Sequence, residues 1–434
     1  MKAVYMLIGM MLVYRPVSAQ WNLQQCLVYA QHNNQELLAK QGQLPVAGLE
    51  KKIASAKFIP EVNAVLESSY YWKIPVQSFP GELLGLPAER VAIATGSKFS
   101  GNYDIQLKWT ALDLLNWQDI KLQRLKEEAV QHGVAALEKL LLRHVKVCFY
   151  SMQIQRKNLD LSKNMLQQHA RIHELMTQRF AQGVLDKIAF NQSASILAGY
   201  QQQHDEADIV LQKALLELKF WMGFPLEDSL EIQDAELGLS LTETVSSFSA
   251  RNLPDYNEKE SAVKIAFQQW QRSKYFRVPQ LSLVSSFGQI GFGDGFKEFA
   301  SLAKWHNKGF VGFQLRLPLW NPQVLRLQKR DRMWYHQKTL EFTAYKMQEN
   351  QRFVQLQLEL RRSLKACLTQ QGKRQLAEEN LLLCSKKIEL GIIDMLQLQQ
   401  IQQELMACIR EENKAKLAYL QHLMDLNYLQ DDTL

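Results

Sequence analysis

The apolar residues of this chain follow two periods, one of two residues and one of seven. In the stretches 103–111 and 311–319, apolar side chains occupy the odd positions and mostly polar ones the even positions. This alternation is typical of a β-strand with one apolar and one polar face. The residues expected on the apolar face are Ile105, Leu107, Trp109, Phe313, Leu315 and Leu317.

Two further stretches, 62–72 and 281–287, show a weaker form of the same alternation. Apart from the shorter 281–287, these stretches are about nine to eleven residues long, the length of a tilted strand that crosses a bilayer. The alternative is a soluble sandwich with one wet face, but four strands in a mainly helical chain would make a poor sandwich. Aromatic residues gather near the strand ends, as they do at membrane interfaces: Tyr70, Tyr71, Trp72, Phe287, Trp305, Phe310 and Trp320.

The seven-residue period predicts long helices. Apolar residues recur at 145, 152, 159 and 166, and a second stripe runs from 353 to 388 with one basic interruption, Arg374. Such stripes make a helix pack along its whole length, as in a coiled coil. A helix over 115–182 would be about 100 Å long at 1.5 Å per residue, which suits a tube better than a globular core.

The two halves of the chain repeat one plan. Gln106-Leu107-Lys108 recurs as Gln314-Leu315-Arg316, and Gly183-Val184-Leu185-Asp186 recurs as Gly391-Ile392-Ile393-Asp394, both at an offset of 208 residues. A constant offset indicates a duplication, because the segment between the motifs keeps its length. We predict a first repeat over 20–230, an irregular joint over 231–256 and a second repeat over 257–434.

Each repeat is expected to contain a helix, a β-hairpin and a helical hairpin. A helix is expected over 23–57 in the first half and over 258–275 in the second. The β-hairpins are expected at about 60–112 and about 280–320, and the helical hairpins at about 115–222 and about 322–428.

Residues 1–19 have the features of a secretory leader. Lys2 gives a positive start, the run 4–13 is almost wholly apolar, and Val17-Ser18-Ala19 offers a peptidase site. Cleavage there would leave Gln20 first. The alternative is a short membrane anchor, for which the apolar run is too short.

Charge and cysteine content narrow the classes of function. The net charge of +7 arises from 51 basic and 44 acidic residues without a dense basic block, so no nucleic-acid partner is expected. Five cysteines without paired spacing make no disulfide framework.

Motifs for metal binding, phosphate binding or catalysis are weak in this sequence. His169 and His173 are four residues apart on a predicted helix, but no third metal ligand accompanies them. The run 291–295, Gly-Phe-Gly-Asp-Gly, lacks the Lys-Ser of a phosphate loop and is interpreted as loop punctuation between strands. No catalytic triad or close carboxylate pair is evident, so no metal, cofactor or enzymatic activity is expected.

The two glycine turns are candidate functional sites. Glycine permits the chain reversal between helices. The apolar pairs Val184-Leu185 and Ile392-Ile393 are candidates for docking a partner protein, since exposed apolar patches mark interfaces. Asp186 and Asp394 each follow a glycine and two apolar residues, a position at which aspartate caps the next helix.

These motifs together resemble the TolC-like outer-membrane efflux protein family. The segments that carry the resemblance over nearly the whole chain are Phe58-Ile59-Pro60, Val311-Gly312-Phe313-Gln314-Leu315, Leu317-Pro318-Leu319-Trp320, Arg179-Phe180-Ala181-Gln182-Gly183 and Leu218-Lys219-Phe220-Trp221-Met222-Gly223. The resemblance implies a homotrimer in which four strands per chain share one twelve-stranded barrel above a helical conduit. It also implies an inner-membrane pump and a periplasmic adaptor as partners. By the same resemblance Asp394, with Asp186 at the repeated position, is a candidate for the periplasmic mouth of the pore, and helix capping is the alternative role.

We therefore expect a mostly α-helical protein with long coiled-coil hairpins and four transmembrane β-strands per chain. The expected function is passive export through the outer membrane and periplasm of a Gram-negative bacterium, in an efflux or type I secretion system. A periplasmic coiled-coil adaptor or scaffold without a barrel is the alternative, against which the four alternating strands and their aromatic ends argue.

Overall fold

The computed structural model describes residues 20–85, 90–234, 248–301, 305–389 and 395–430. The chain divides into two compact units, each of which draws on both sequence halves. One unit comprises 43–130 and 260–342, and the other comprises the remaining segments. The expected leader and the turn Gly391–Asp394 lie outside the described residues. The described chain is mostly helical with a small sheet part, which confirms the predicted fold class.

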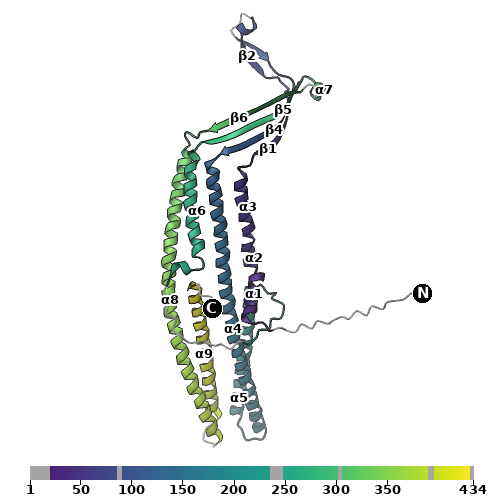
Figure 1. Cartoon of the computed structure of the whole chain (residues 1–434). Coiled ribbons are helices and arrows are strands. Elements are labelled where there is room, and N and C mark those ends of the chain that lie inside the picture. Colours follow the sequence, from purple (N-terminus) through teal and green to yellow (C-terminus); the bar gives the residue numbers. More distant parts are fainter. Residues whose placement is uncertain (1–19, 86–89, 235–247, 302–304, 390–394, 431–434) are drawn as a thin grey trace, which may run out of the picture. The chain divides into compact units, whose positions relative to one another are not determined.

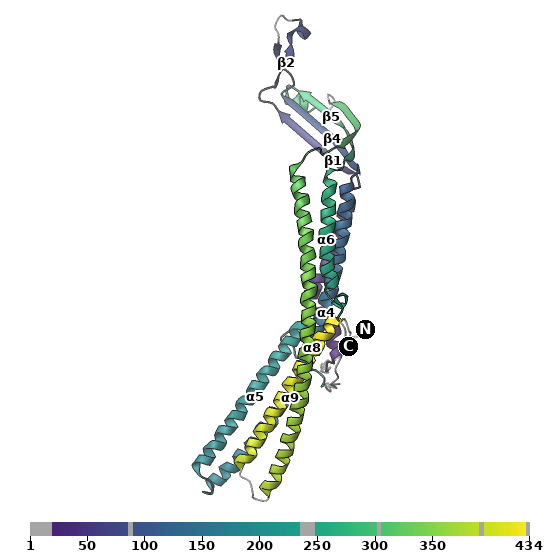
Figure 2. The same ribbon diagram turned by 90° about the vertical axis from the view of Figure 1, so that its left-hand side faces the viewer.

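The sheet unit contains one four-stranded antiparallel sheet (Figures 1 and 2). Its strands are β1 (Glu61–Tyr70), β4 (Phe99–Leu112), β5 (Gln280–Gly293) and β6 (His306–Arg316), in the spatial order β1-β4-β5-β6. Among the residues that the structure describes, β1 and β6 therefore each have one edge without a strand partner. β6 ends at Arg316 because Pro318 has no N–H to continue the ladder.

A second small hairpin interrupts the first connection of the sheet. β2 (Val76–Pro80) pairs with β3 (Arg90–Ala94), with a short 3-10 helix, η1 (Gly81–Leu84), between them. The sequence analysis expected a single hairpin over about 60–112 and did not predict this second one. Strands of five residues are too short to show a clear alternation beside so many glycines and prolines.

The helical segments of the sheet unit form an open row in the order α3, α4, α6, α8 (Figure 1). The row consists of α3 (Gln43–Ala56) and parts of α4 (Leu114–Ala181), α6 (Tyr256–Lys274) and α8 (Pro322–Glu389). Asp119 of α4 pairs with Lys57, just beyond α3, at 3.1 Å and with Arg272 of α6. Gln328 of α8 donates to the Ser273 carbonyl at 2.9 Å. These contacts leave α3 and α8 at the two ends of the row.

The other unit contains the helical hairpins. It comprises α1 (Leu23–Asn33), α2 (Gln35–Gln41), α5 (Lys187–Met222), α9 (Met395–Gln430) and the remaining parts of α4 and α8. One continuous helix over 23–57 was predicted, which is wrong. Asn34 interrupts it: its backbone is extended, and its side chain accepts from the Leu37 N–H at 3.0 Å. The interruption is an N-cap, a position that asparagine favours.

The seven-residue stripes lie in the cores of this unit. Val145, Met152 and Phe353 are buried, as are Leu360 and Cys367. Phe353, Leu360 and Cys367 share one cluster that also includes residues of α9. The stripes therefore pack the long helices, as their period predicts.

No helix within the described ranges is both long and apolar enough to cross a membrane.

Candidate functional site: the strand faces and the helix turn

The register of the sheet defines its two faces. Trp109, Leu283 and Phe313 lie in one row across β4, β5 and β6. Successive residues of a strand point to opposite faces, so Ile105, Leu107 and Trp109 share the face of Phe313 and Leu315. Most of these side chains are exposed in the single chain, Phe313 to 78% and Leu315 to 58%. Leu317 is also exposed and lies one residue beyond β6.

The opposite face of the sheet is polar. It includes Gln106, Lys108, Gln314 and Arg316, all exposed, and Asp104, which is 4% exposed. Asp104 forms an ion pair with Lys308 of β6 at 3.0 Å. The sequence missed this pair, because alternation assigns a residue to a face but does not give the register between strands.

The two faces are not uniform. Phe310 lies on the polar face and is 61% exposed. Gln289 and Asn307 lie on the apolar face, where the Gln289 amide donates to Asn307 Oδ1 at 2.8 Å. This hydrogen bond satisfies part of the polar groups of both residues on an apolar surface.

Glycines of β4 and β5 make room for aromatic rings near one end of the sheet. A Cβ atom on Gly101 would lie 2.6 Å from the ring of Phe299, and one on Gly291 would collide with Trp305. The interpretation of 291–295 as loop punctuation is therefore wrong for its first three residues, which belong to β5. Glycine stands at both positions because the rings of Phe299 and Trp305 lie directly against the strand backbone.

The first helix turn lies within the described residues. Gly183 has φ +75°, a left-handed conformation that glycine adopts without strain. Asp186 is the N-cap of α5, and its carboxylate accepts from the Ala189 N–H at 2.6 Å. Val184 is 75% exposed and Leu185 is half-buried. Asp186 thus caps the helix, a role that is compatible with a place at a pore mouth.

The second helix turn, Gly391, Ile392, Ile393 and Asp394, lies outside the described residues. The structure describes the flanking helices, α8 up to Glu389 and α9 from Met395. The sites predicted in this turn stay predictions.

The histidine pair is engaged in packing and hydrogen bonding. His169 stacks on Tyr200 with ring centroids 4.0 Å apart, and burial lowers its pKa. His173 Nδ1 lies 2.8 Å from the Ser193 hydroxyl. In the described part of the chain, no group of three or more histidine, cysteine or acidic residues could hold a metal ion.

The ends of the helix row carry exposed apolar stripes. On α3, Val46, Leu49 and Ile53 are 56–58% exposed at helical spacing. On α8, Met333 and Leu340 are 61% and 57% exposed and seven residues apart.

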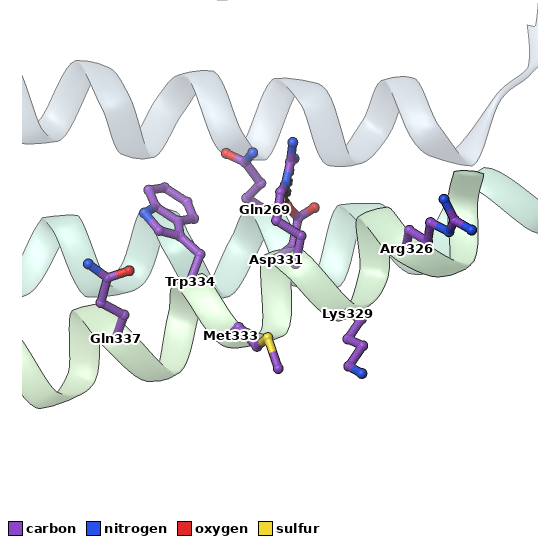
Figure 3. A pocket seen from close by; sticks show the side chains of 8 residues that line it. Gln269, Arg326, Lys329, Asp331, Met333, Trp334 and Gln337 are labelled. Carbon is purple, nitrogen blue, oxygen red and sulfur yellow. Dashed lines mark hydrogen bonds and ion pairs between the residues drawn. The ribbon is translucent and has the colours of Figure 1, made fainter. Parts of the chain in front are cut away.

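Beside Met333, a hollow of about 670 Å³ is lined by residues of α8 and by Gln269 of α6 (Figure 3). The side chains that line it are Gln269, Arg326, Lys329, Arg330, Asp331, Met333, Trp334 and Gln337.

Known proteins match this fold. The family model of the outer membrane efflux proteins matches residues 27–223. The CmeC outer membrane channel of Campylobacter jejuni has 12% identity and a TM-score of 0.77, covering 94% of this chain and 85% of that chain. The MtrE outer membrane channel of Neisseria gonorrhoeae has 14% identity and a TM-score of 0.72, covering 94% and 88%. No curated protein matches the sequence.

The fold is therefore that of the outer-membrane channel proteins. The family model and the fold agree, and they confirm the predicted resemblance to the TolC-like outer-membrane efflux proteins. This family consists of channels and not of enzymes.

Proposed function

We propose that this chain is the outer-membrane channel subunit of a tripartite efflux or type I secretion system, and that it conducts solutes passively. The observation that carries the proposal is the four-stranded sheet with one exposed apolar face and one polar face. In the proposed orientation, Leu107, Phe313 and Leu315 contact lipid, while Gln106 and Gln314 face water. The chain is located in the outer membrane and extends into the periplasm.

The free edges of the sheet support assembly of several copies. A four-stranded sheet in lipid would leave the N–H and C=O groups of β1 and β6 unsatisfied, at several kcal/mol for each group. Closed single-chain barrels need about eight strands or more, so several chains must share one barrel. Pairing of β6 in one copy with β1 in the next satisfies both edges. Three copies, the number implied by the family, give the twelve-stranded barrel.

The helix row supports the same head-to-tail arrangement. Its two ends, α3 and α8, carry the exposed apolar stripes, and they are the helices next to the edge strands β1 and β6 in the chain. Contact between α8 of one copy and α3 of the next would cover Met333 on one side and Ile53 on the other. Head-to-tail contacts of this kind close into a ring when the rotation allows it.

We further propose that a periplasmic adaptor and an inner-membrane pump act with this channel. The exposed Val184 and the half-buried Leu185 fit a surface that a partner's helices cover. Gly183, Gly391, Ile392 and Ile393 belong to the same proposed docking turns, and Asp186 and Asp394 to the periplasmic mouth.

Conductance in a planar lipid bilayer tests the proposed function. The purified chain is expected to insert spontaneously and to give discrete, stable steps of ion current. A protein that binds membranes or partner proteins but never conducts would instead support the periplasmic adaptor or scaffold.

A further inference from the structure

One carboxylate on the polar face of the sheet is buried. Asp104 of β4 is 4% exposed, whereas Gln106 and Lys108 on the same strand face are exposed. Asp104 Oδ2 accepts a hydrogen bond from Asn102 Nδ2 at 2.7 Å and lies 3.0 Å from Lys308 Nζ. The side chain of Lys308 is 38% exposed and that of Asp104 is 5% exposed, so the pair contacts solvent mainly through Lys308.

The two charged residues lie on strands that are not neighbours. Asp104 is opposite Gly288 of β5, and Gly288 is opposite Lys308 of β6. At a strand spacing of about 4.8 Å, their Cα atoms are about 9.6 Å apart, so the side chains must meet over β5.

Gly288 makes this crossing possible. A Cβ atom at this position would collide with the Tyr103 carbonyl oxygen and lie 2.6 Å from Asp104 Oδ1. Any other residue would therefore occupy the space in which the carboxylate reaches Lys308. The row Asp104–Gly288–Lys308 is a sterically defined site for one ion pair.

We propose that Lys308 neutralises Asp104 on the wall of the lumen and so keeps this carboxylate from making the channel more cation-selective, an inference that rests on the proposed function. The polar face lines the lumen, so each copy contributes one pair to a ring. A carboxylate with an ammonium group 3.0 Å away has a weak field at longer range, because the two fields largely cancel. An unpaired carboxylate in a pore attracts cations and repels anions. Lys308 thus keeps the negative charge of Asp104 from acting on permeating ions.

Reversal potentials under a potassium chloride gradient test this proposal. Lys308→Met is expected to raise the cation-over-anion permeability ratio, because it uncovers three carboxylates. Asp104→Asn is expected to lower the ratio below the wild-type value, because it frees three ammonium groups. The double variant is expected to return to the wild-type ratio. Lys297→Met is the control, since Lys297 is exposed on the short helix α7 (Phe296–Phe299), outside the strand faces.

A purely structural role of the pair predicts a different pattern. If the pair is only structural, both single variants lower the stability of the assembly, and their cation-over-anion permeability ratios do not change in opposite directions. Asp104→Asn leaves no buried charge, so it keeps the test available even if Lys308→Met fails to assemble. Wild-type selectivity in an assembled, conducting Asp104→Asn channel would overturn the proposal. A wild-type protein that never conducts would instead refute the proposed function.

Discussion

Arg374 of α8 and Glu412 of α9 form an ion pair with 2.6 Å between Nε and Oε2, and the Glu412 side chain is 3% exposed. Lys416, one turn further along α9, lies 2.6 Å from the other carboxylate oxygen. Arg374 is the basic residue that interrupts the apolar stripe of the second half. Its partner across the helical hairpin explains how a cation is accommodated there, and a polar pair at such a position fixes the register of the helices.

Replacement of Glu412 tests the value of this pair. Glu412→Ala leaves Arg374 and Lys416 without their buried partner and is expected to destabilise the protein by about 2 kcal/mol, the order of the cost of leaving buried polar groups unpaired. The neighbouring Glu411 is 57% exposed, and its carboxylate lies 4.0 Å from Lys414 Nζ, which is a long distance for an ion pair. Glu411→Ala is therefore expected to change stability by less than about 0.5 kcal/mol. Thermal unfolding followed by circular dichroism compares the two variants. An equal loss of stability in both would show that the buried pair stabilises the protein no more than the exposed one.

Substitution on the apolar strand face tests its contact with lipid. Leu315→Arg is expected to destabilise the inserted protein by about 2–4 kcal/mol if position 315 lies near the bilayer midplane. Gln314→Arg, on the polar face of the same strand, is the matched control and is expected to have little effect. The yield of folded protein in isolated outer membranes measures both. Cysteine labelling gives an independent readout, and rapid aqueous labelling at 315 with protection at 314 would reverse the assignment of the faces.

The first helix turn is expected to be needed for export but not for folding. Val184 is 75% exposed, so Val184→Glu is expected to leave the assembled channel in the membrane while it abolishes contact with the adaptor. Gln182→Glu introduces the same charge two residues away, at another exposed position, and is the control. Export in whole cells and conductance of the purified channel are measured side by side. Normal export by the Val184→Glu channel would remove the docking site from this turn.

The apolar stripe of α3 is expected to contact the neighbouring copy. Ile53→Lys places a charge in the proposed contact and is expected to shift the complex towards single chains. Ser55→Lys adds the same charge at another exposed position of α3, two residues away and off the stripe, and should leave assembly unchanged. Size-exclusion chromatography with light scattering compares the variants. Identical masses for both would show that this stripe lies outside the interface.

The sequence predicts where the helices and strands lie better than it predicts which residues of different elements contact each other. Alternation identifies β4 and β6 because their apolar faces carry large side chains, such as Trp109 and Phe313. It identifies β5 less well, because serine and glycine stand at several of its apolar-face positions, including Ser285 and Gly291. The hairpin β2–β3 was missed because its strands have five residues each.

The candidate sites divide in the same way. The capping role of Asp186 follows from a local signal, a short polar residue after a glycine turn. The pair of Asp104 and Lys308 depends on the register of three strands, and that of Arg374 and Glu412 on the register of two helices. Such pairs form where distant segments pack together, and the periodicity of one segment does not predict which residue of another segment it will meet.

The number of chains in the detergent-solubilised complex tests the central claim, the shared barrel, most directly. Native mass spectrometry of the protein extracted from outer membranes is expected to give several copies of the chain, because the edges of β1 and β6 must be paired in lipid, and the number that the family resemblance implies is three. A stable single chain that retains its β-sheet and conducts ions would contradict the account.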